Sequence, residues 1–234
     1  MKTISTGKTA VSGQTAEGNE QTAVSGIGII DFKLYLITDR RLFDRASSFF
    51  TAIEETLRGG VRAIQLREKD LGIRALLAMA YRLRDLTREY NASLFINDRA
   101  DVALAVGADG VHLGQRGIPA SAAKKIPVSK LLVGVSTHSL AEALEAEREG
   151  ADFVTLGPLY PTSSKLPFGE PLGMGVLREV RSVVRIPIFG IGGIIPDRVK
   201  EVTGSGAFGV AVISAILGSK NRKQSTEEFL RYLE

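Results

Sequence analysis

The sequence predicts an α/β protein that folds as a single (β/α)8 TIM barrel. At four points of the chain a helical pattern ends on a glycine and an apolar strand pattern begins, namely at Gly60, Gly107, Gly150 and Gly206. The spacings of 47, 43 and 56 residues between these points are too long for one strand and one helix, and they fit two of each. A further strand pattern lies upstream of each glycine. Eight strands that alternate with helices through right-handed crossovers close into a parallel barrel.

Each expected strand is a short run of apolar and β-branched residues that ends in polar residues or glycine. Because the strands of such a barrel are parallel, these ends all meet at one mouth. The expected strands cover residues 34–38, 61–70, 93–97, 110–115, 131–136, 151–154, 186–191 and 207–213.

The expected helices follow the strands and carry local start and stop signals. Ser139 and Glu142 have the spacing of a capping box. Asn97 or Asp98 is expected as an N-cap, because Asx side chains accept hydrogen bonds from the first turn. The expected helices cover residues 46–58, 72–90, 99–106 and 140–149, and two more begin near Pro196 and Ser214.

Composition fits one domain and excludes several classes of protein. The chain has 234 residues, of which 44% are hydrophobic and 24% charged, as in a soluble domain with a full core. Thirty basic and 26 acidic residues give a net charge of only +4, without basic clusters interleaved with aromatics, so no nucleic-acid partner is expected. The absence of cysteine excludes disulfides and thiolate chemistry and agrees with a cytoplasmic location. The longest apolar stretch, 207–217, is shorter than the ~18 residues of a membrane span.

Residues 1–31 differ from the rest of the chain. They are rich in Ser, Thr, Gly, Gln and Ala and repeat Thr-Ala-Val-Ser-Gly at 9–13 and 22–26, without a helical or strand period. We expect this segment to be a disordered, low-complexity extension. No apolar segment follows its basic residues, so a secretory signal is not expected. The barrel domain is expected over 32–234.

The stretch 61–70 is the first candidate for a functional site. Its alternation places Gln65, Arg67 and Lys69 on one face of a strand, so that an amide, a guanidinium and an ammonium converge at its carboxyl end. The alternative is a solvated turn in which Arg67, Glu68 and Lys69 pair with one another.

Three later strand ends carry further candidates. Asn97 and Asp98 offer an amide and a carboxylate that suit a hard cation such as Mg²⁺, besides the capping role. His112 lies between Val and Leu, so an interior histidine is favoured over a metal ligand. His138 follows a strand and is placed for proton transfer or for orienting a neighbouring group.

The last three loops of the barrel predict phosphate binding. The longest loop, 157–165, carries three hydroxyls and an ammonium that can donate to phosphate oxygens. Glycines after the seventh strand let the backbone approach an anion, and a short helix near Ser214 would present N–H groups to the same place. The loops after strands seven and eight form the recurrent phosphate site of this fold.

These motifs together resemble the thiamine phosphate synthase family. They occur in family order on the expected strand ends, cover almost the whole barrel and leave out residues 1–31. The motifs are Gln65-Leu66-Arg67-Glu68-Lys69, Asn97-Asp98, residues 110–115 (GVHLGQ), residues 134–136 (GVS), Gly157-Pro158 with residues 161–165, residues 190–193 (GIGG) and Ile213-Ser214.

The resemblance implies a transferase that joins an aminopyrimidine methyl diphosphate to a thiazole phosphate and releases pyrophosphate. In the family the diphosphate leaves first, and the thiazole nitrogen captures a stabilised pyrimidine cation. Such a step needs neutralised leaving-group charge and aligned substrates more than a protein nucleophile.

The resemblance also assigns residues by position. Mg²⁺ would be bound by Asp98. The residues expected to act in the chemistry are Arg67, Lys69, Ser136 and Lys165. Those expected to bind the pyrimidine diphosphate are Gln65, Arg67, Lys69, Asn97, Ser136 and Lys165, and Leu66 and Glu68 belong to the same motif. Those expected to bind the thiazole phosphate are Thr162, Ser164, Gly192, Ile213 and Ser214, with Ser163 in the same loop.

One position departs from the family pattern. The family has Gly-Gln-x-Asp after the fourth strand, where the Asp is a second metal ligand, and this chain has Gly117 in its place. Asp98 with the substrate diphosphate could hold Mg²⁺, or Arg116 could supply charge directly. A thiazole tautomerase of the same barrel family, with His138 as acid and base, is therefore the alternative enzyme. A non-catalytic regulator that binds a thiazole or thiamine phosphate is the non-enzymatic alternative. The oligomeric state is left open.

Overall fold

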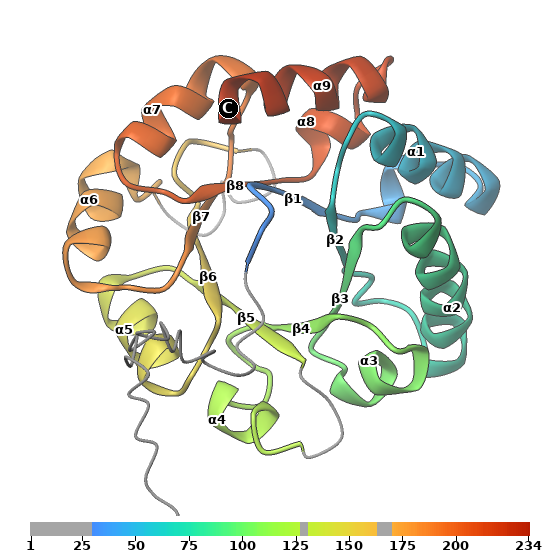
Figure 1. The fold of residues 1–234 in the computed structure, drawn as a ribbon, viewed down its shortest axis with the longest axis horizontal. Helices are drawn as coiled ribbons and strands as arrows, with labels where there is room; N and C mark the ends of the chain where they lie inside the picture. The colour runs from blue at the N-terminus through green and yellow to red at the C-terminus, as the bar shows by residue number, and fades with distance from the viewer. Residues whose placement is uncertain (1–29, 127–130, 163–169) are drawn as a thin grey trace, which may run out of the picture.

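Eight parallel strands close into a barrel in the order β1 to β8, with β1 paired to β8 (Figure 1). The computed structural model describes residues 30–126, 131–162 and 170–234. The closed parallel sheet confirms the predicted (β/α)8 barrel. The strands are β1 (Leu34–Ile37), β2 (Ala63–Leu66), β3 (Ser93–Asn97), β4 (Gly110–Leu113), β5 (Leu132–Thr137), β6 (Phe153–Leu156), β7 (Ile188–Ile191) and β8 (Gly209–Val212).

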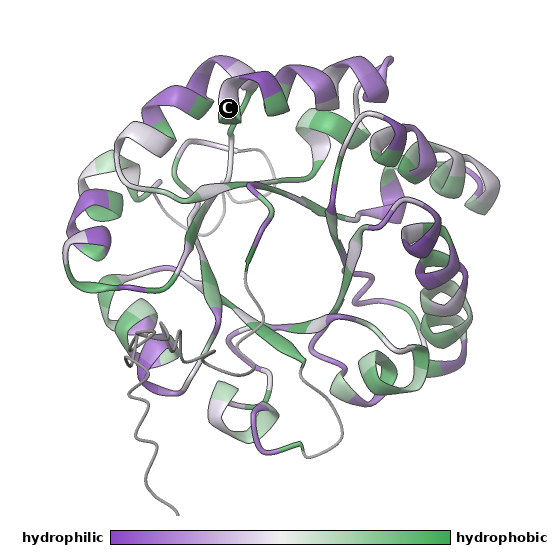
Figure 2. Cartoon of the chain, in the orientation of Figure 1, coloured by the Kyte–Doolittle hydropathy of each residue, from purple (hydrophilic) through white to green (hydrophobic). Residues whose placement is uncertain are grey.

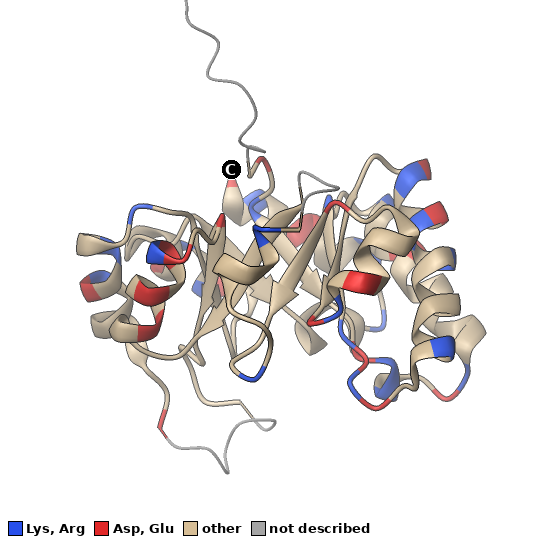
Figure 3. Cartoon of the chain, turned by 90° about the horizontal axis from the view of Figure 1, so that it is seen from below, with Lys and Arg blue, Asp and Glu red and all other residues tan. Residues whose placement is uncertain are grey.

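Helices surround the barrel and turn their apolar faces toward it (Figure 2). Charged residues lie on the helices and loops, and none of the described strands contains one (Figure 3). The helices are α1 (Ala46–Arg58), α2 (Ile73–Glu89), α3 (Ala100–Val106), α4 (Ala120–Ala123), α5 (Leu140–Arg148), α6 (Gly173–Val183), α7 (Val199–Gly204), α8 (Ser214–Leu217) and α9 (Arg222–Leu233), with short 3₁₀ turns η1 (Arg40–Leu42) and η3 (Pro196–Arg198).

The period of two along each strand divides the core into two layers. In β2, Ile64 and Leu66 belong to the outer layer between strands and helices. The inner layer fills the barrel with aromatic rings, and Tyr35 lies at its centre, 5.3 Å from Phe95 and 5.5 Å from Phe153 between ring centroids. The interior is thus a packed core, and the polar ends of the strands lie at the mouth.

The amino-terminal side of the barrel is covered by the segment before β1. Phe32 is 4% exposed and its ring stacks 5.3 Å from that of Phe189. Ile30 is also buried in the inner layer. The expectations for residues 1–29 lie outside the described residues. Among the residues that the structure describes, no helix has the length and apolar character that a membrane span requires.

Two local expectations meet different outcomes. The capping box is present, because the Ser139 hydroxyl accepts from the Glu142 N–H at 3.2 Å, although the Glu142 carboxylate returns to the N–H of His138 and not to that of Ser139. The expectation that Asn97 or Asp98 caps the next helix is wrong. The residue at the N-cap position of α3 is Arg99, without a side-chain cap, because the Asp98 carboxylate bonds to the loop after β4.

Candidate active site

The end of β2 delivers polar side chains to the barrel mouth as the alternation predicts. Gln65 faces the interior, where it is 1% exposed, and its Nε2 has no hydrogen-bond partner among the described residues. Arg67 follows and is half-buried, and Lys69 is exposed. This face therefore runs from the barrel interior out to solvent.

Glu68 points the other way and stabilises the loop. Its Oε1 accepts from Thr38 Oγ1 at 2.6 Å and from the Arg40 N–H at 3.1 Å, while the Arg67 N–H donates to Thr38 Oγ1 at 3.0 Å. Burial raises the pKa of Glu68, and the bond from Thr38 offsets this only in part. Glu68 thus bonds to the loop after β1, whereas the alternative expected it to pair with Arg67 and Lys69. A contact of Glu68 with substrate stays a prediction.

Asp98 joins the loops after β3 and β4. It has a left-handed backbone, with φ of 59°, and its Oδ1 accepts from the Gly114 N–H at 2.6 Å. Its Oδ2 accepts from Asn97 Nδ2 at 2.7 Å. A β-carbon at Gly114 would lie 3.4 Å from Asp98 Oδ1 and 3.8 Å from Lys69 Nζ. The carboxylate and the ammonium predicted from separate motifs therefore border the same small space.

The donor set around Asp98 fits a cation that also binds substrate. Among the described residues, no group of three or more His, Cys, Asp or Glu could hold a metal ion. A β-carbon at Gly117 would lie 2.8 Å from Asp98 Oδ1, so the position at which the family pattern has an acid lies against Asp98. One carboxylate can hold Mg²⁺ when substrate phosphates and water complete the octahedron.

His112 is an interior histidine, as predicted. It is 1% exposed, and its Nε2 lies 3.0 Å from Ser136 Oγ and its Nδ1 lies 3.4 Å from the Tyr35 hydroxyl. Burial lowers the pKa of His112 to about 3, with smaller contributions from the charges of Arg67 and Lys69.

His138 lies at the rim and is paired with Glu142. Its Nδ1 is 3.2 Å from Glu142 Oε2, which also accepts from Gln115 Nε2 at 2.8 Å. Gln115 Nε2 in addition donates to the Ser136 carbonyl at 2.9 Å. These bonds tie the loop after β4 to the end of β5. Sequence reasoning missed Gln115 and Glu142 as supports of the site.

The loops after β6 and β7 are bonded to each other. The Leu159 N–H donates to the Ile191 carbonyl at 2.9 Å, and the Tyr160 N–H donates to the Gly192 carbonyl at 3.1 Å. Gly192 has φ of 97°, and a β-carbon there would lie 2.6 Å from that of Pro158. A glycine is therefore required for the two loops to approach this closely.

Arg198 supports this pair of loops and was not expected from the sequence. Its guanidinium lies 4.4 Å from the centre of the Tyr160 ring, and Nη1 donates to the Gly193 carbonyl at 2.6 Å. Tyr160 in turn donates to Glu201 Oε2 at 2.6 Å, and burial, together with this carboxylate, raises the pKa of Tyr160 to about 12. Because Arg198 is 38 residues from Tyr160 in the chain, no local pattern links them.

The structure places most of the predicted site residues at one end of the barrel. Ile213 and Ser214 follow β8, and α8 begins at Ser214 as expected. Thr162 is half-buried in the loop after β6. Ser163, Ser164 and Lys165 lie outside the described residues. The strand ends that carry Gln65, Asn97, Ser136, Gly192 and Ile213 are all carboxyl ends of one closed parallel sheet.

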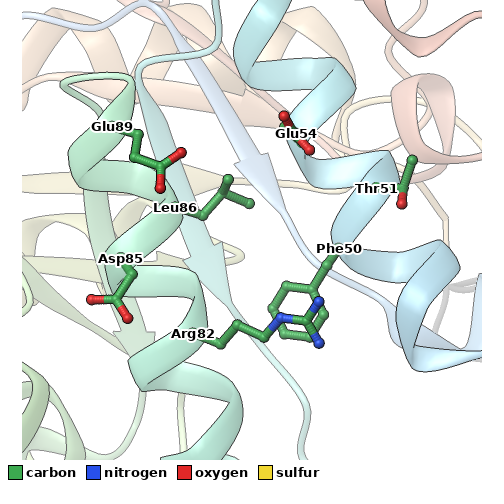
Figure 4. A pocket seen from close by; sticks show the side chains of 7 residues that line it. All are labelled: Phe50, Thr51, Glu54, Arg82, Asp85, Leu86 and Glu89. Atoms are coloured by element: carbon green, nitrogen blue, oxygen red, sulfur yellow. The ribbon is translucent and has the colours of Figure 1, made fainter.

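Two surface hollows differ in their relation to this mouth. One of about 550 Å³ adjoins the loop after β4 and is lined by Gly114, Gln115, Gly117 and the acidic face of α5. The other, of about 260 Å³, lies between α1 and α2 on the outside of the barrel (Figure 4). There Arg82 stacks 3.9 Å above the Phe50 ring. Of these two hollows, the first adjoins a loop of the mouth.

Comparison with known proteins identifies the family. The family model described as thiamine monophosphate synthase matches residues 34–216. The chain belongs to the thiamine monophosphate synthase family. A putative thiamine-phosphate synthase of Geobacter sulfurreducens is 46% identical over 204 residues, which are 87% of this chain and 95% of that protein. The thiamine-phosphate synthase of Pyrococcus furiosus is 45% identical over 202 residues, 86% of this chain and 95% of that one.

Solved structures agree with this membership. The thiamine phosphate pyrophosphorylase from Pyrococcus furiosus superposes with a TM-score of 0.77 at 44% identity, covering 86% of this chain and 95% of that one. A 3-hexulose-6-phosphate synthase from Salmonella typhimurium has a TM-score of 0.67 at 18% identity, which shows the shared barrel alone. The resemblance to the thiamine phosphate synthase family and the assignment to a class of transferases are thus confirmed.

Proposed function

We propose that this chain condenses 4-amino-2-methyl-5-(diphosphooxymethyl)pyrimidine with a thiazole phosphate to give thiamine phosphate and pyrophosphate. The observation that carries the proposal is the convergence of Asp98 and Lys69 beside the loop after β4, with the half-buried Arg67 two residues before Lys69 at the end of β2. Two cations and a carboxylate at one barrel mouth suit a diphosphate that must leave with its negative charge neutralised. The family and the names of its members agree with this chemistry.

The two substrates are proposed to bind to different parts of the mouth, the pyrimidine diphosphate in one and the thiazole phosphate in the other. Arg67, Lys69 and Ser136 donate to the diphosphate and offset the charge that develops as it leaves, and Gln65 and Asn97 hold the pyrimidine. Lys165 is proposed as a further cation for the diphosphate. No protein nucleophile is required, since the pyrimidine cation is captured by the thiazole nitrogen. Leu66 and Glu68 lie in the same motif, and Glu68 supports the loop through Thr38.

The other half of the mouth is proposed to hold the thiazole phosphate. The hydroxyls of Thr162, Ser163, Ser164 and Ser214 would donate to its oxygens, and the backbone at Gly192 and Ile213 would approach them. Support comes from the close bonding between the loops after β6 and β7. Backbone N–H groups and hydroxyls suit a phosphate that is bound and not transferred.

Asp98 is proposed to hold Mg²⁺ together with the substrate diphosphate. The ion would neutralise diphosphate charge on departure. The Asp98 carboxylate already accepts hydrogen bonds from Gly114 and Asn97, and these bonds fix the orientation of the side chain. Arg116, exposed on the same loop, is proposed as an additional positive charge near the position of the missing acid.

The alternative of a thiazole tautomerase requires His138 to act as acid and base. The pairing of His138 with Glu142 supplies a suitable dyad, but it does not account for Asp98 and Lys69. A regulator that only binds the phosphates would need neither the carboxylate nor a dyad. A cytoplasmic location and the oligomeric state stay predictions.

The deciding experiment measures thiamine phosphate formed from both substrates at saturating Mg²⁺. We expect the unmodified chain to form product, Asp98→Ala to abolish turnover, and Asp101→Ala to retain it, because Asp101 is an exposed carboxylate on α3 that bonds to Arg99. Absence of coupling by the unmodified chain, with isomerisation of a thiazole carboxylate phosphate that depends on His138, would identify the tautomerase instead.

A further inference from the structure

A line of polar groups runs from the barrel interior to the mouth. The Tyr35 hydroxyl lies 3.4 Å from His112 Nδ1, and His112 Nε2 lies 3.0 Å from Ser136 Oγ. Gln65, which also faces the interior, is 1% exposed. Tyr35 and His112 are as deeply buried as the phenylalanines around them, at 0% and 1% exposure. Polar groups buried in this way are costly unless their hydrogen bonds are satisfied.

The neighbouring residues make this line possible. A β-carbon at Gly134 would lie 2.6 Å from His112 Nδ1, so the glycine leaves the space in which the imidazole meets the Tyr35 hydroxyl. Phe153 packs against both rings, with centroids 5.5 Å from Tyr35 and 5.7 Å from His112. Among the residues that the structure describes, no carboxylate bonds to His112, and burial lowers its pKa to about 3, so the imidazole is neutral at neutral pH.

A neutral imidazole has one donor and one acceptor, so its tautomer decides the direction of every bond in the line. Among the described residues, the hydrogen-bond partner of the Tyr35 hydroxyl is His112 Nδ1. The phenolic proton therefore has one acceptor, Nδ1, and leaving a buried donor without an acceptor is unfavourable.

We propose that Tyr35 and His112 are positioning residues that direct the Ser136 hydroxyl proton toward the anionic substrate. Tyr35 donates to Nδ1, which places the imidazole proton on Nε2, and Nε2–H donates to Ser136 Oγ. The Ser136 oxygen then accepts from within the core, and its own proton is available to the diphosphate. This inference rests on the proposed function of Ser136 as a diphosphate contact.

The opposite tautomer would give Ser136 the opposite role. With the proton on Nδ1, Nε2 would accept from the Ser136 hydroxyl, and Ser136 could offer only lone pairs to the mouth. An anionic leaving group would then face an acceptor, which disfavours charge development there. The direction of the hydrogen bond between His112 and Ser136 therefore decides whether Ser136 stabilises the departing diphosphate or opposes its departure.

The tautomer can be measured directly because the chain has only two histidines. Two-bond ¹H–¹⁵N correlation spectra of the ¹⁵N-histidine-labelled full chain at neutral pH distinguish Nε2–H from Nδ1–H, and His138→Gln assigns the other imidazole. We expect His112 to be the Nε2–H tautomer in the protein without substrate. A spectrum of the Nδ1–H tautomer overturns the proposal.

The effect on Ser136 is tested by a double-mutant cycle on the rate of pyrophosphate release. Tyr35→Phe should lower kcat about tenfold in the unmodified background, in line with one lost directing hydrogen bond, and should change the KM of either substrate less than twofold. In a Ser136→Ala background the same substitution should change kcat less than twofold. Equal losses in both backgrounds would mean that Tyr35 acts on stability alone and would overturn the proposal.

A matched control separates the role of this hydroxyl from a general effect of removing one. Tyr81→Phe removes a hydroxyl that donates to the Ala105 carbonyl on the outside of the barrel, and it should leave kcat unchanged. The spectra and the kinetics also distinguish a failure of the proposed function from a failure of this inference. A chain that forms no thiamine phosphate contradicts the proposed function, whereas the tautomer of His112 is read without any substrate.

Discussion

Gly117 lies directly against Asp98, so that a β-carbon at Gly117 would be 2.8 Å from Asp98 Oδ1. A tight turn sets this distance, in which the Gly117 N–H donates to the Gly114 carbonyl at 2.9 Å while the Gly114 N–H donates to Asp98 at 2.6 Å. The loop after β4 lacks the second acid of the family pattern, but it still borders Asp98, the acid that this chain keeps. Any Mg²⁺ held here depends on one carboxylate and on the substrate.

Gly117→Asp should therefore increase the apparent affinity for Mg²⁺. The new carboxylate would lie beside Asp98, and a second anionic oxygen ligand favours a hard cation. We expect the Mg²⁺ concentration for half-maximal thiamine phosphate formation to fall at least about tenfold, the scale on which changes around a metal ligand alter affinity. The measurement is a Mg²⁺ titration at fixed, saturating concentrations of both substrates.

The control for this prediction adds the same charge elsewhere. Gly204 is the last residue of α7, at the end of the barrel opposite the mouth, and a β-carbon there would contact nothing within 4 Å. Gly204→Asp should leave the Mg²⁺ requirement unchanged. An unchanged requirement in Gly117→Asp as well would show that the turn over residues 114–117 does not face the ion.

Arg198→Ala should weaken binding of the thiazole phosphate selectively. Arg198 stacks on Tyr160 and donates to the Gly193 carbonyl, so its loss releases both glycine-containing loops on that side of the mouth. Loss of a hydrogen bond from a charged donor and of a cation–π contact predicts a rise of about five- to tenfold in the KM for the thiazole phosphate. The KM for the pyrimidine diphosphate should stay within twofold, and an equal rise in both would contradict separate halves of the mouth.

Glu68→Gln should change how stability depends on pH. Burial raises the pKa of Glu68 above its ordinary 4.5, so the folded state favours the protonated acid. The stability that this provides is fully present below the unfolded pKa and is lost as pH rises through the folded pKa. The free energy of unfolding of Glu68→Gln minus that of the unmodified chain should therefore increase as pH rises above about 4.5. Urea unfolding between pH 4 and 8 measures this, and a constant or decreasing difference contradicts it.

The sequence predicted those features that follow from a local period. Gln65 and Ile64 lie on opposite faces of β2 because successive side chains of a strand alternate between its faces. The carboxyl ends of the strands meet because each crossover joins two parallel strands. The same reasoning could not orient Glu68, whose partner Thr38 is 30 residues away. It assigned a cap to Asp98 from residue type alone, and the bond from Gly114, 16 residues later, prevailed.

Supports between distant loops were the least predictable part of the site. Tyr160 and Arg198 meet only because the loops after β6 and β7 are neighbours in the closed sheet. The partners of His112 are on β1 and β5, so its interior location could be predicted from its apolar neighbours, whereas its contact with Ser136 could not. Prediction from one sequence thus succeeded for side chains at strand ends and failed for the contacts that orient them.

Gly134→Ala should destabilise the fold and disturb the mouth together. A methyl group there would overlap the buried Phe153 ring and lie 2.6 Å from His112 Nδ1, where neither ring has room to move. Overpacking of this kind costs about 1 to 3 kcal/mol in the free energy of unfolding. Gly204→Ala, at an open position, should cost nothing measurable. Because Gly134 borders both the Phe153 ring and His112 Nδ1, urea unfolding and the histidine spectra should change together in Gly134→Ala. A destabilised variant with an unaltered His112 tautomer would mean that the core absorbs the methyl group without moving the imidazole.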